Sequence, residues 1–268
     1  MKTIRTSSGT TVSYSVAGSG PPLVLVHGAF SDHETNWAFV APGFQQRFTV
    51  YAIARRGRGL ADATTDHTLD DEAQDVAAVV RSIGAPVRLL GHSYGAHCAL
   101  LAAAQQPDCV EKVVLYEPAW PSIMNPDAMS ALETLATAGD WDQFAFAFFG
   151  ETLHVPLREL EALRVSELWA PIVADAPASL GDLRALRAHR FDPGRFAGLR
   201  IPVLLQVGSE SPRDLYVTDA LAAVLRDVQI DTLAGQAHEA MTTAPRLYTE
   251  ATMAFLLAAS IVDVTSGM

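Results

Sequence analysis

The chain has 268 residues, of which 49% are hydrophobic and 18% are charged. That composition is sufficient for one large core, and α/β folds of this size commonly form a single domain. The formal net charge of −11 argues against nucleic acid and anionic membrane surfaces as partners, because both select basic patches. We expect a cytoplasmic protein, since no segment resembles a signal peptide or a membrane span.

Strands and helices alternate along most of the chain, which is the pattern of a parallel sheet covered on both faces. In chain order the apolar runs predict a hairpin of residues 2–6 and 11–17, strands at 22–26, 48–53, 87–90, 112–116, 202–207 and 228–233, and helices at 71–83, 96–106, 215–226 and from 245 onward. We therefore predict an α/β fold with a mostly parallel central sheet flanked by helices.

About eighty residues separate the strand at 112–116 from the strand at 202–207, too many for an ordinary crossover loop. They predict an inserted helical lid at 120–198 and a core domain formed by 1–119 together with 199–268. Glycines and prolines divide the insertion into short helices, expected at 126–138, 141–149, 156–169 and 178–189. The second of these helices is crowded with aromatic residues, namely Trp141, Phe144, Phe146, Phe148 and Phe149.

The segment Gly91-His92-Ser93-Tyr94-Gly95 lies between the predicted strand at 87–90 and the predicted helix at 96–106. A serine flanked by glycines in a tight strand-to-helix turn is the Gly-x-Ser-x-Gly nucleophile elbow, which exposes the hydroxyl at the carboxyl edge of the sheet. The motif indicates that Ser93 is a nucleophile, provided that an oxyanion donor, an acid and a histidine accompany it.

Upstream of the elbow, the apolar run at 22–26 leads directly into the turn His27-Gly28-Ala29-Phe30. With this turn and the elbow, the sequence resembles the α/β-hydrolase superfamily. The resemblance implies that the backbone N–H groups of Ala29 and Tyr94 hold the oxyanion. Fixed N–H dipoles of this kind are aimed at the negative charge that develops in the transition state.

Near the other end of the chain, the loop Ala234-Gly235-Gln236-Ala237-His238 follows the predicted strand at 228–233. Members of the superfamily carry the catalytic histidine in this loop, usually in a Gly-x-x-His setting. The resemblance therefore implies that His238 is the general base. A neutral imidazole suits this role, because it titrates near neutral pH and takes the serine proton as attack begins.

The acid is where the chain departs from the commonest pattern of the superfamily. After the strand at 202–207, most members place an aspartate where this chain has Ser211. Some members, certain lactone hydrolases among them, place the acid after the preceding strand, which here ends at Glu117. We favour Glu117 as the residue that orients His238, and we keep Glu210 and Asp214 as alternatives.

These residues predict a serine hydrolase that cleaves an ester or lactone bond of a small apolar substrate through an acyl-enzyme. No cofactor is expected, and no metal either, because no pair of residues has a recognised ligand spacing. The pocket wall is predicted to contain Phe30, Trp37, Trp120, Met124, Trp141, Phe144 and Phe148. Alternatives are a cofactor-free perhydrolase, carbon–carbon hydrolase or lyase, and a catalytically silent small-molecule receptor. The sequence leaves open whether the protein is a monomer or a homodimer.

Overall fold

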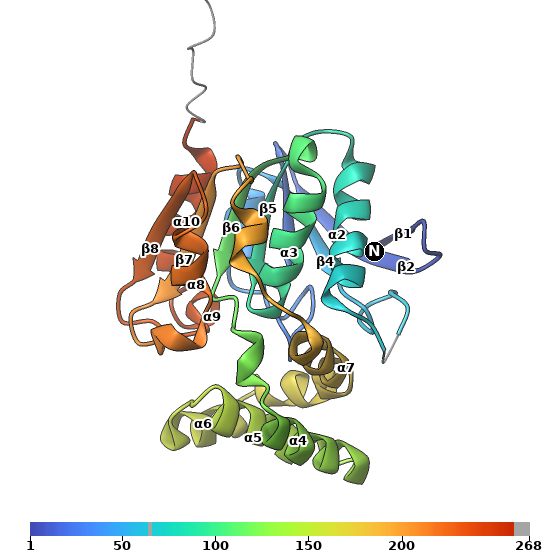
Figure 1. Ribbon diagram of the computed structural model, residues 1–268, viewed down its shortest axis with the longest axis vertical. Coiled ribbons are helices and arrows are strands. Elements are labelled where there is room, and N and C mark those ends of the chain that lie inside the picture. The colour runs from blue at the N-terminus through green and yellow to red at the C-terminus, as the bar shows by residue number, and fades with distance from the viewer. Residues whose placement is uncertain (64–65, 260–268) are drawn as a thin grey trace, which may run out of the picture.

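The computed structural model describes residues 1–63 and 66–259 (Figure 1). One sheet contains eight strands in the order β1-β2-β4-β3-β5-β6-β7-β8. The strands are β1 (Lys2–Arg5), β2 (Thr11–Gly18), β3 (Pro22–Val26), β4 (Thr49–Ala54), β5 (Val87–His92), β6 (Val110–Tyr116), β7 (Val203–Gly208) and β8 (Val228–Leu233). Strand β2 runs antiparallel to β1 and β4, and all other neighbours are parallel. The mostly parallel α/β sheet predicted from the sequence is confirmed.

Helices cover both faces of the sheet, so successive residues of a central strand enter different core clusters. Leu89 packs in the cluster that contains residues of α2 (Leu69–Ile83), α3 (Tyr94–Gln105) and α8 (Thr218–Ala222). Leu90 packs in the cluster on the other face, with residues of α1 (Ala41–Gln45), α9 (Ala240–Thr243) and α10 (Pro245–Leu257). This double burial explains why the central strands read as continuous apolar runs.

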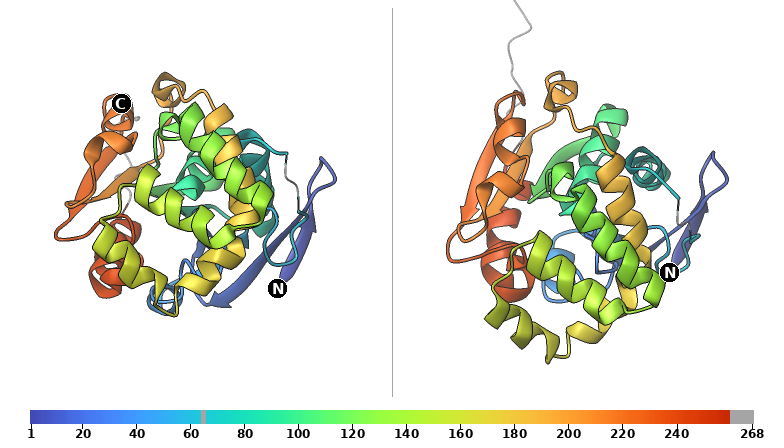
Figure 2. Two further views of the ribbon diagram at one scale, coloured as in Figure 1. Left: turned by 90° about the horizontal axis from the view of Figure 1, so that it is seen from below. Right: turned by 60° about the horizontal axis from the view of Figure 1, so that its bottom comes forward.

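The chain between β6 and β7 forms a helical insertion, defined here as residues 121–196. It contains η2 (Pro121–Ile123), α4 (Pro126–Ala138), α5 (Trp141–Ala147), η3 (Phe148–Thr152), α6 (Leu157–Arg164), α7 (Trp169–Ala188) and η4 (Pro193–Phe196). Figures 1 and 2 show α4, α5 and α6 gathered beyond the end of the sheet where β6 finishes, with α7 leading back toward the core.

Helix α7 is longer than the sequence predicts, because it runs through Pro171 and Pro177, where we expected breaks. Pro171 lies in the first turn, where a backbone N–H has no acceptor within the helix and its loss costs little. Pro177 removes one internal hydrogen bond. The side chains of Asp175, Ser179 and Asp182, spaced along one face of α7, bond to arginines of the core and hold the helix across this defect.

The helix predicted at 215–226 is mostly absent, and only α8 (Thr218–Ala222) forms within it. Before α8 the chain forms a single 3-10 turn, η5 (Arg213–Leu215), and Tyr216 is extended. Trp120 N–H donates to the Leu215 carbonyl at 2.8 Å, and Val217 N–H donates to the Pro118 carbonyl at 2.9 Å. Pairing with the segment that leaves β6 therefore replaces the first turn of the predicted helix.

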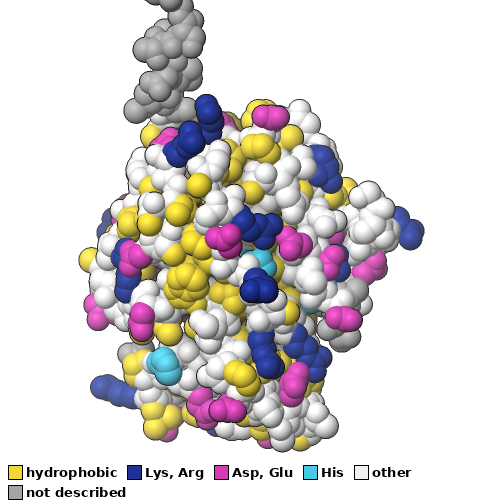
Figure 3. Space-filling model, in the orientation of Figure 1, with side chains coloured by type: hydrophobic (Ala, Val, Ile, Leu, Met, Phe, Trp, Pro, Cys, Tyr) yellow, Lys and Arg dark blue, Asp and Glu magenta, His cyan; other side chains and the backbone are white. Residues whose placement is uncertain are grey.

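Acidic and basic side chains are interspersed over the face of the molecule seen in Figure 3, with apolar side chains between them. Within the described ranges, no helix is long and apolar enough to cross a membrane.

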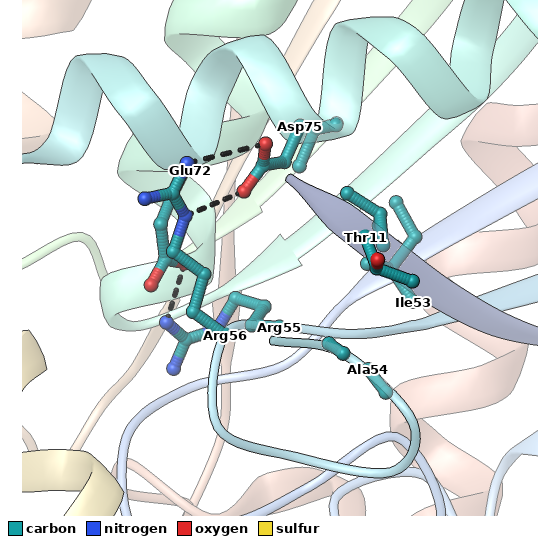
Figure 4. Close-up of a pocket in the computed structure, with 10 residues that line it drawn as sticks. Thr11, Ile53, Ala54, Arg55, Arg56, Glu72 and Asp75 are labelled. Carbon is teal, nitrogen blue, oxygen red and sulfur yellow. Dashed lines mark hydrogen bonds and ion pairs between the residues drawn. The ribbon is translucent and has the colours of Figure 1, made fainter. Parts of the chain in front are cut away.

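A buried group of charged side chains joins α2, the loop after β4 and α7. Arg55 pairs with Glu72 at 2.7 Å and with Asp182 at 2.7 Å. Figure 4 shows the Arg55–Glu72 pair, and beside it the pair of Arg56 and Asp75, at the edge of a cavity of about 10 Å³. This charge cluster consists of the cations Arg55, Arg58 and His67 and the anions Glu72, Asp175 and Asp182.

His67 carries a proton in this charge cluster at neutral pH. Burial lowers the pKa of His67, but hydrogen bonds and charges of Asp182 and Glu72 raise it to about 9. With His67 protonated, three cations face three anions, so the charges of this cluster compensate one another.

The raised pKa of His67 predicts a loss of stability in alkaline solution. Because the pKa in the folded state lies above the ordinary value of 6.5, the stabilisation is complete below pH 6.5 and is lost as the pH rises through about 9. Urea unfolding from pH 6 to pH 10 measures this effect. The free-energy difference between wild type and His67→Gln should shrink as the pH rises, and a difference that does not change with pH would contradict the assignment.

Candidate active site

Ser93 lies in the turn between β5 and α3, with φ of 53° and ψ of −121°. Its flanking glycines are required by close packing. A Cβ atom on Gly95 would lie 2.3 Å from the carbonyl oxygens of Val26 and His27, and one on Gly91 would lie 2.6 Å from the Ala96 Cα. The elbow thus presses against the end of β3, and the Ser93 side chain is half-buried at the carboxyl edge of the sheet.

Backbone strain is concentrated around Ser93. Of the four described non-glycine residues with positive φ, three follow the carboxyl ends of the central strands β3, β5 and β6: Phe30 at 56°, Ser93 at 53° and Glu117 at 49°. Each such conformation costs on the order of 1–3 kcal/mol and persists where the surroundings enforce it, most often at functional sites.

The turn after β3 brings a free N–H donor to the elbow. A Cβ atom on Gly28 would lie 3.2 Å from the Ser93 Cβ, so the turn and the elbow are in direct contact. The Ala29 N–H has no acceptor among the described residues. Tyr94 is the first residue of α3, and an N–H at that position has no acceptor within its helix. Two unpaired donors therefore flank the contact between turn and elbow.

Glu117 is the candidate acid that the structure brings to His238. Glu117 Oε2 lies 2.6 Å from His238 Nδ1, while Oε1 accepts the Gly208 N–H at 2.7 Å. The Glu117 side chain is fully buried. Glu210 and Asp214 are both exposed, and neither contacts His238. In the position where most relatives carry the acid, the Ser211 Oγ is buried without a hydrogen-bond partner among the described residues.

Three aromatic side chains hold the His238 loop, and the sequence did not single them out. The Tyr216 ring is nearly parallel to the imidazole, at 14° and 5.5 Å, and burial together with the charge of Glu117 raises the pKa of its hydroxyl. The Tyr116 hydroxyl donates to the carbonyl of Ala237, and His92 Nε2 lies 3.1 Å from the carbonyl of His238. The extended segment at Tyr216, where a helix was predicted, is what brings that ring to the site.

The electrostatics of His238 follow from these neighbours. Burial lowers the pKa of His238, but the hydrogen bond and the charge of Glu117 outweigh it, so the pKa lies above its ordinary value. The Glu117 carboxylate also fixes the tautomer, because Nδ1 must carry the proton to donate to it. The lone pair of the neutral ring is then on Nε2, where a base needs it.

The candidate nucleophile Ser93 and the candidate base His238 are not hydrogen-bonded to each other in this structure. Within the described ranges, Ser93 Oγ makes no hydrogen bond, to His238 or to any other residue. Such contacts are often long in the absence of substrate and tighten when substrate binds. The arrangement therefore provides a formed acid–base pair beside a half-buried serine whose hydroxyl is unpaired among the described residues.

Aromatic rings of the insertion pack around Phe30, the residue next to the free Ala29 donor. The Phe30 ring centroid lies 4.6 Å from that of Phe148, 5.3 Å from that of Phe149 and 5.7 Å from that of Phe144. Trp141 touches Phe144 edge-on at 5.4 Å. This aromatic cluster brings together four of the predicted pocket residues and adds Phe149.

The other predicted pocket residues are not members of the aromatic cluster. Trp120 contacts Phe191 edge-on at 5.5 Å, where the chain enters and leaves the insertion. Met124 is buried in the same core cluster as Phe30. The prediction that Trp37 belongs to the pocket wall is wrong, because Trp37 packs with Phe44 and Tyr248 in the core on the opposite face of the sheet. Trp37 lies in the loop that leads from Phe30 to α1, and its carbonyl accepts hydrogen bonds from the N–H groups of Val40 and Ala41 at the start of that helix.

Two groups of side chains have the composition of metal ligands. His92, His238 and Glu239 form one, and His67, Glu72 and Asp182 form the other, each with ligand atoms within 4.8 Å of one another. In the second group the carboxylates are neutralised by Arg55. In the first, both imidazoles already bond to protein groups. The expectation that the protein needs no metal stays a prediction.

Comparison with known proteins places the chain in a family. Residues 23–251 match the model of the alpha/beta hydrolase family, so the chain belongs to that family. It is 31% identical over 215 residues to N-formylmaleamate deformylase of Pseudomonas putida, which covers 74% of this chain and 75% of that protein. An alpha/beta hydrolase structure from Sphaerobacter thermophilus has a TM-score of 0.82 and 29% identity, and the match covers 95% of this chain and 100% of the other.

A third relative matches over a shorter stretch. The chain is 35% identical over 127 residues to 2-(acetamidomethylene)succinate hydrolase of Mesorhizobium japonicum. That match covers 46% of this chain and 44% of the relative, so it spans less than half of either protein.

The Glu117–His238 contact predicts a measurable shift in the pKa of His238. Replacing Glu117 with glutamine removes the charge that raises this pKa, while burial still lowers it, so the pKa should fall. NMR titration of the His238 ring measures it directly. Glu210→Gln serves as the control and should leave the titration unchanged, since Glu210 makes no contact with the ring. The assignment fails if the two variants titrate alike.

Proposed function

We propose that this protein is a serine hydrolase that cleaves an ester or lactone bond of a small apolar substrate through an acyl-enzyme. The observation that carries the proposal is the hydrogen bond of 2.6 Å between the buried Glu117 carboxylate and the partly buried His238 ring, beside the strained Ser93 elbow. Membership of the alpha/beta hydrolase family supports the general chemistry.

In the proposed first half-reaction, Ser93 Oγ attacks the carbonyl carbon while His238 Nε2 takes its proton. The oxyanion of the tetrahedral intermediate accepts hydrogen bonds from the N–H groups of Ala29 and Tyr94, for which the described residues provide no acceptor. His238 then returns the proton to the departing alkoxide oxygen as the ester C–O bond breaks. The product is an acyl group on Ser93 and a free alcohol, which in a lactone stays attached to the acyl chain.

Water completes the cycle by the same route. His238 removes a proton from the water molecule as its oxygen attacks the acyl carbon, and then returns the proton to Ser93 as the acyl group leaves as a carboxylic acid. Glu117 keeps its negative charge throughout, holds Nδ1–H and stabilises the imidazolium that forms twice in each turnover.

The helical insertion is proposed to act as a lid that supplies the substrate pocket. The aromatic cluster of Phe30, Trp141, Phe144, Phe148 and Phe149 is adjacent to the Ala29 donor. The nearby arginines Arg55 and Arg58 are both neutralised by buried carboxylates. An apolar acyl chain or ring suits these surroundings better than an anionic substrate, because both of these cations already pair with carboxylates of the protein.

Hydrolysis of an N-acyl bond is a second candidate, favoured by the likeness to N-formylmaleamate deformylase. The same residues serve it, with His238 giving its proton to the departing nitrogen. A panel of substrates separates the two candidate functions. It contains lactones and, for each acyl group, an aryl ester and the matched N-acyl enamine. The first proposal requires that kcat/KM for oxygen esters exceeds that for the matched N-acyl compounds beyond their difference in intrinsic reactivity.

Replacing Ser93 with alanine should abolish ester turnover and leave the protein folded, because its hydroxyl bonds to no described residue. The expected fall is roughly a thousandfold or more, as for other members of catalytic triads. A fluorophosphonate should label wild type and fail to label Ser93→Ala. An unlabelled wild type would favour a silent receptor, and substantial turnover by the variant would refute the mechanism.

Truncating a ring of the aromatic cluster should change the preference for the acyl group more than it changes the rate of the chemical steps. Phe148→Ala removes the ring stacked on Phe30, so kcat/KM for long or aromatic acyl esters should fall about tenfold or more, as expected for lost burial of a phenyl ring. Turnover of an acetate ester should change much less. Phe39→Ala, at an exposed phenylalanine, is the matched control. Equal losses on every substrate would show that Phe148 only supports the fold.

A further inference from the structure

Arg55, the first residue after β4, holds the turn that carries the Ala29 N–H. Its Nε donates to the carbonyl oxygen of His27 at 2.9 Å, and its Nη2 donates to the carbonyl oxygen of Gly28 at 2.9 Å. The Gly28 carbonyl and the Ala29 N–H belong to one planar trans peptide and point in opposite directions. By fixing the Gly28 oxygen, Arg55 therefore fixes the direction of the Ala29 N–H.

The next peptide of the turn is held from the helical insertion. The Phe30 N–H donates to Ser179 Oγ of α7 at 2.6 Å, and Ser179 donates in turn to Asp175 at 2.7 Å. Because the Ser179 proton goes to Asp175, its oxygen faces Phe30 as an acceptor. Phe30 has a φ of 56°, an unfavourable conformation for phenylalanine, and this hydrogen bond helps to hold it. Both peptides that flank Ala29 are thus fixed by side chains.

Arg55 also contacts the residue that carries the second donor. Its guanidinium carbon lies 4.5 Å from the centroid of the buried Tyr94 ring. A guanidinium over an aromatic face is attracted by the ring quadrupole. One cation therefore touches both segments that supply the proposed oxyanion donors.

Asp182 of α7 fixes Arg55 in turn. Its two carboxylate oxygens accept from Arg55 Nη1 at 3.1 Å and Nη2 at 2.7 Å, a bidentate arrangement that leaves the guanidinium little freedom. Burial raises the pKa of Asp182, but Arg55 and Arg58 hold it well below its usual range. Asp182 therefore stays ionised, and the chain of contacts from α7 to the Gly28 carbonyl remains intact at neutral pH.

We propose that Arg55, Ser179 and Asp182 are positioning residues of the oxyanion hole, so that helix α7 aligns the Ala29 donor in addition to covering the site. This inference rests on the serine hydrolase function proposed above. None of the three residues has to touch the substrate. Their effect falls on the tetrahedral intermediate, because the donors that they align are aimed at charge that develops only there.

Ser179→Ala tests the inference with a small change that removes the acceptor of the Phe30 N–H. We expect kcat for an aryl ester to fall about tenfold, a part of the loss seen when an oxyanion donor is deleted outright, with KM within about twofold. Ser179→Thr keeps the hydroxyl and should restore most of the activity. Ser166→Ala, at an exposed serine of the same insertion, is the matched control and should behave as wild type.

A second readout separates alignment from general loosening of the fold. A trifluoromethyl ketone that adds to Ser93 forms a tetrahedral oxyanion, whereas the alcohol product of the ester carries no negative charge. In Ser179→Ala the inhibition constant of the ketone should rise by about the factor by which kcat/KM falls, while that of the product should stay unchanged. Arg55→Lys keeps the positive charge but loses the planar guanidinium that donates to two carbonyls of the turn at once. The inhibition constant of the ketone should therefore rise further in this variant, again without a change for the product.

The outcomes distinguish this inference from the function on which it rests. Wild type that hydrolyses no ester and takes no fluorophosphonate would remove the proposed function itself. If wild type is active, then unchanged kcat in a folded Ser179→Ala, or a loss confined to KM, would overturn the positioning role alone. Thermal melting of every variant establishes folding. Should Ser179→Ala fail to fold, Ser179→Thr and Arg55→Lys decide the question, and normal ketone affinity in Arg55→Lys would overturn it.

Discussion

The candidate site depends on one hydrogen bond, between the buried Glu117 carboxylate and the His238 ring. Glu117 is rigidly placed because it follows β6 at the centre of the sheet, has its second oxygen bound by the Gly208 N–H and is closed off from water. The low dielectric around the pair strengthens the interaction and keeps the imidazole basic. Orientation of the histidine, its tautomer and its readiness to accept a proton all follow from this contact.

The helical insertion contributes to both sides of the site. Its aromatic residues surround Phe30, and its helix α7 is joined to the core by paired charges that are almost entirely buried. Breaking one partner of such a pair is costly, because the other charge is left without compensation in a low dielectric. The part of the insertion formed by α7 is therefore anchored to the core.

Much of the fold was predictable because the sheet is buried on both faces and its strands are continuous apolar runs. The residues of the site were predictable where one local motif fixes them, as at Ser93. Trp37 was misplaced because its direction depends on the path of a loop, which no local pattern encodes. Helix α7 runs through Pro177 because Arg55 and Arg58, far away in the sequence, bind its charged face. Tyr216 reaches His238 for a similar reason, since pairing with the chain after β6 overrides a helical pattern.

The central claim is that Ser93 becomes acylated, and mass spectrometry of the intact protein tests it most directly. The enzyme is mixed with an ester that is hydrolysed slowly, quenched in acid within the first turnover, and digested to locate the added mass. The account predicts one acyl group per chain, on the peptide that contains Ser93, which disappears as product forms. Turnover without an adduct, or with the acyl group on another residue, would contradict it.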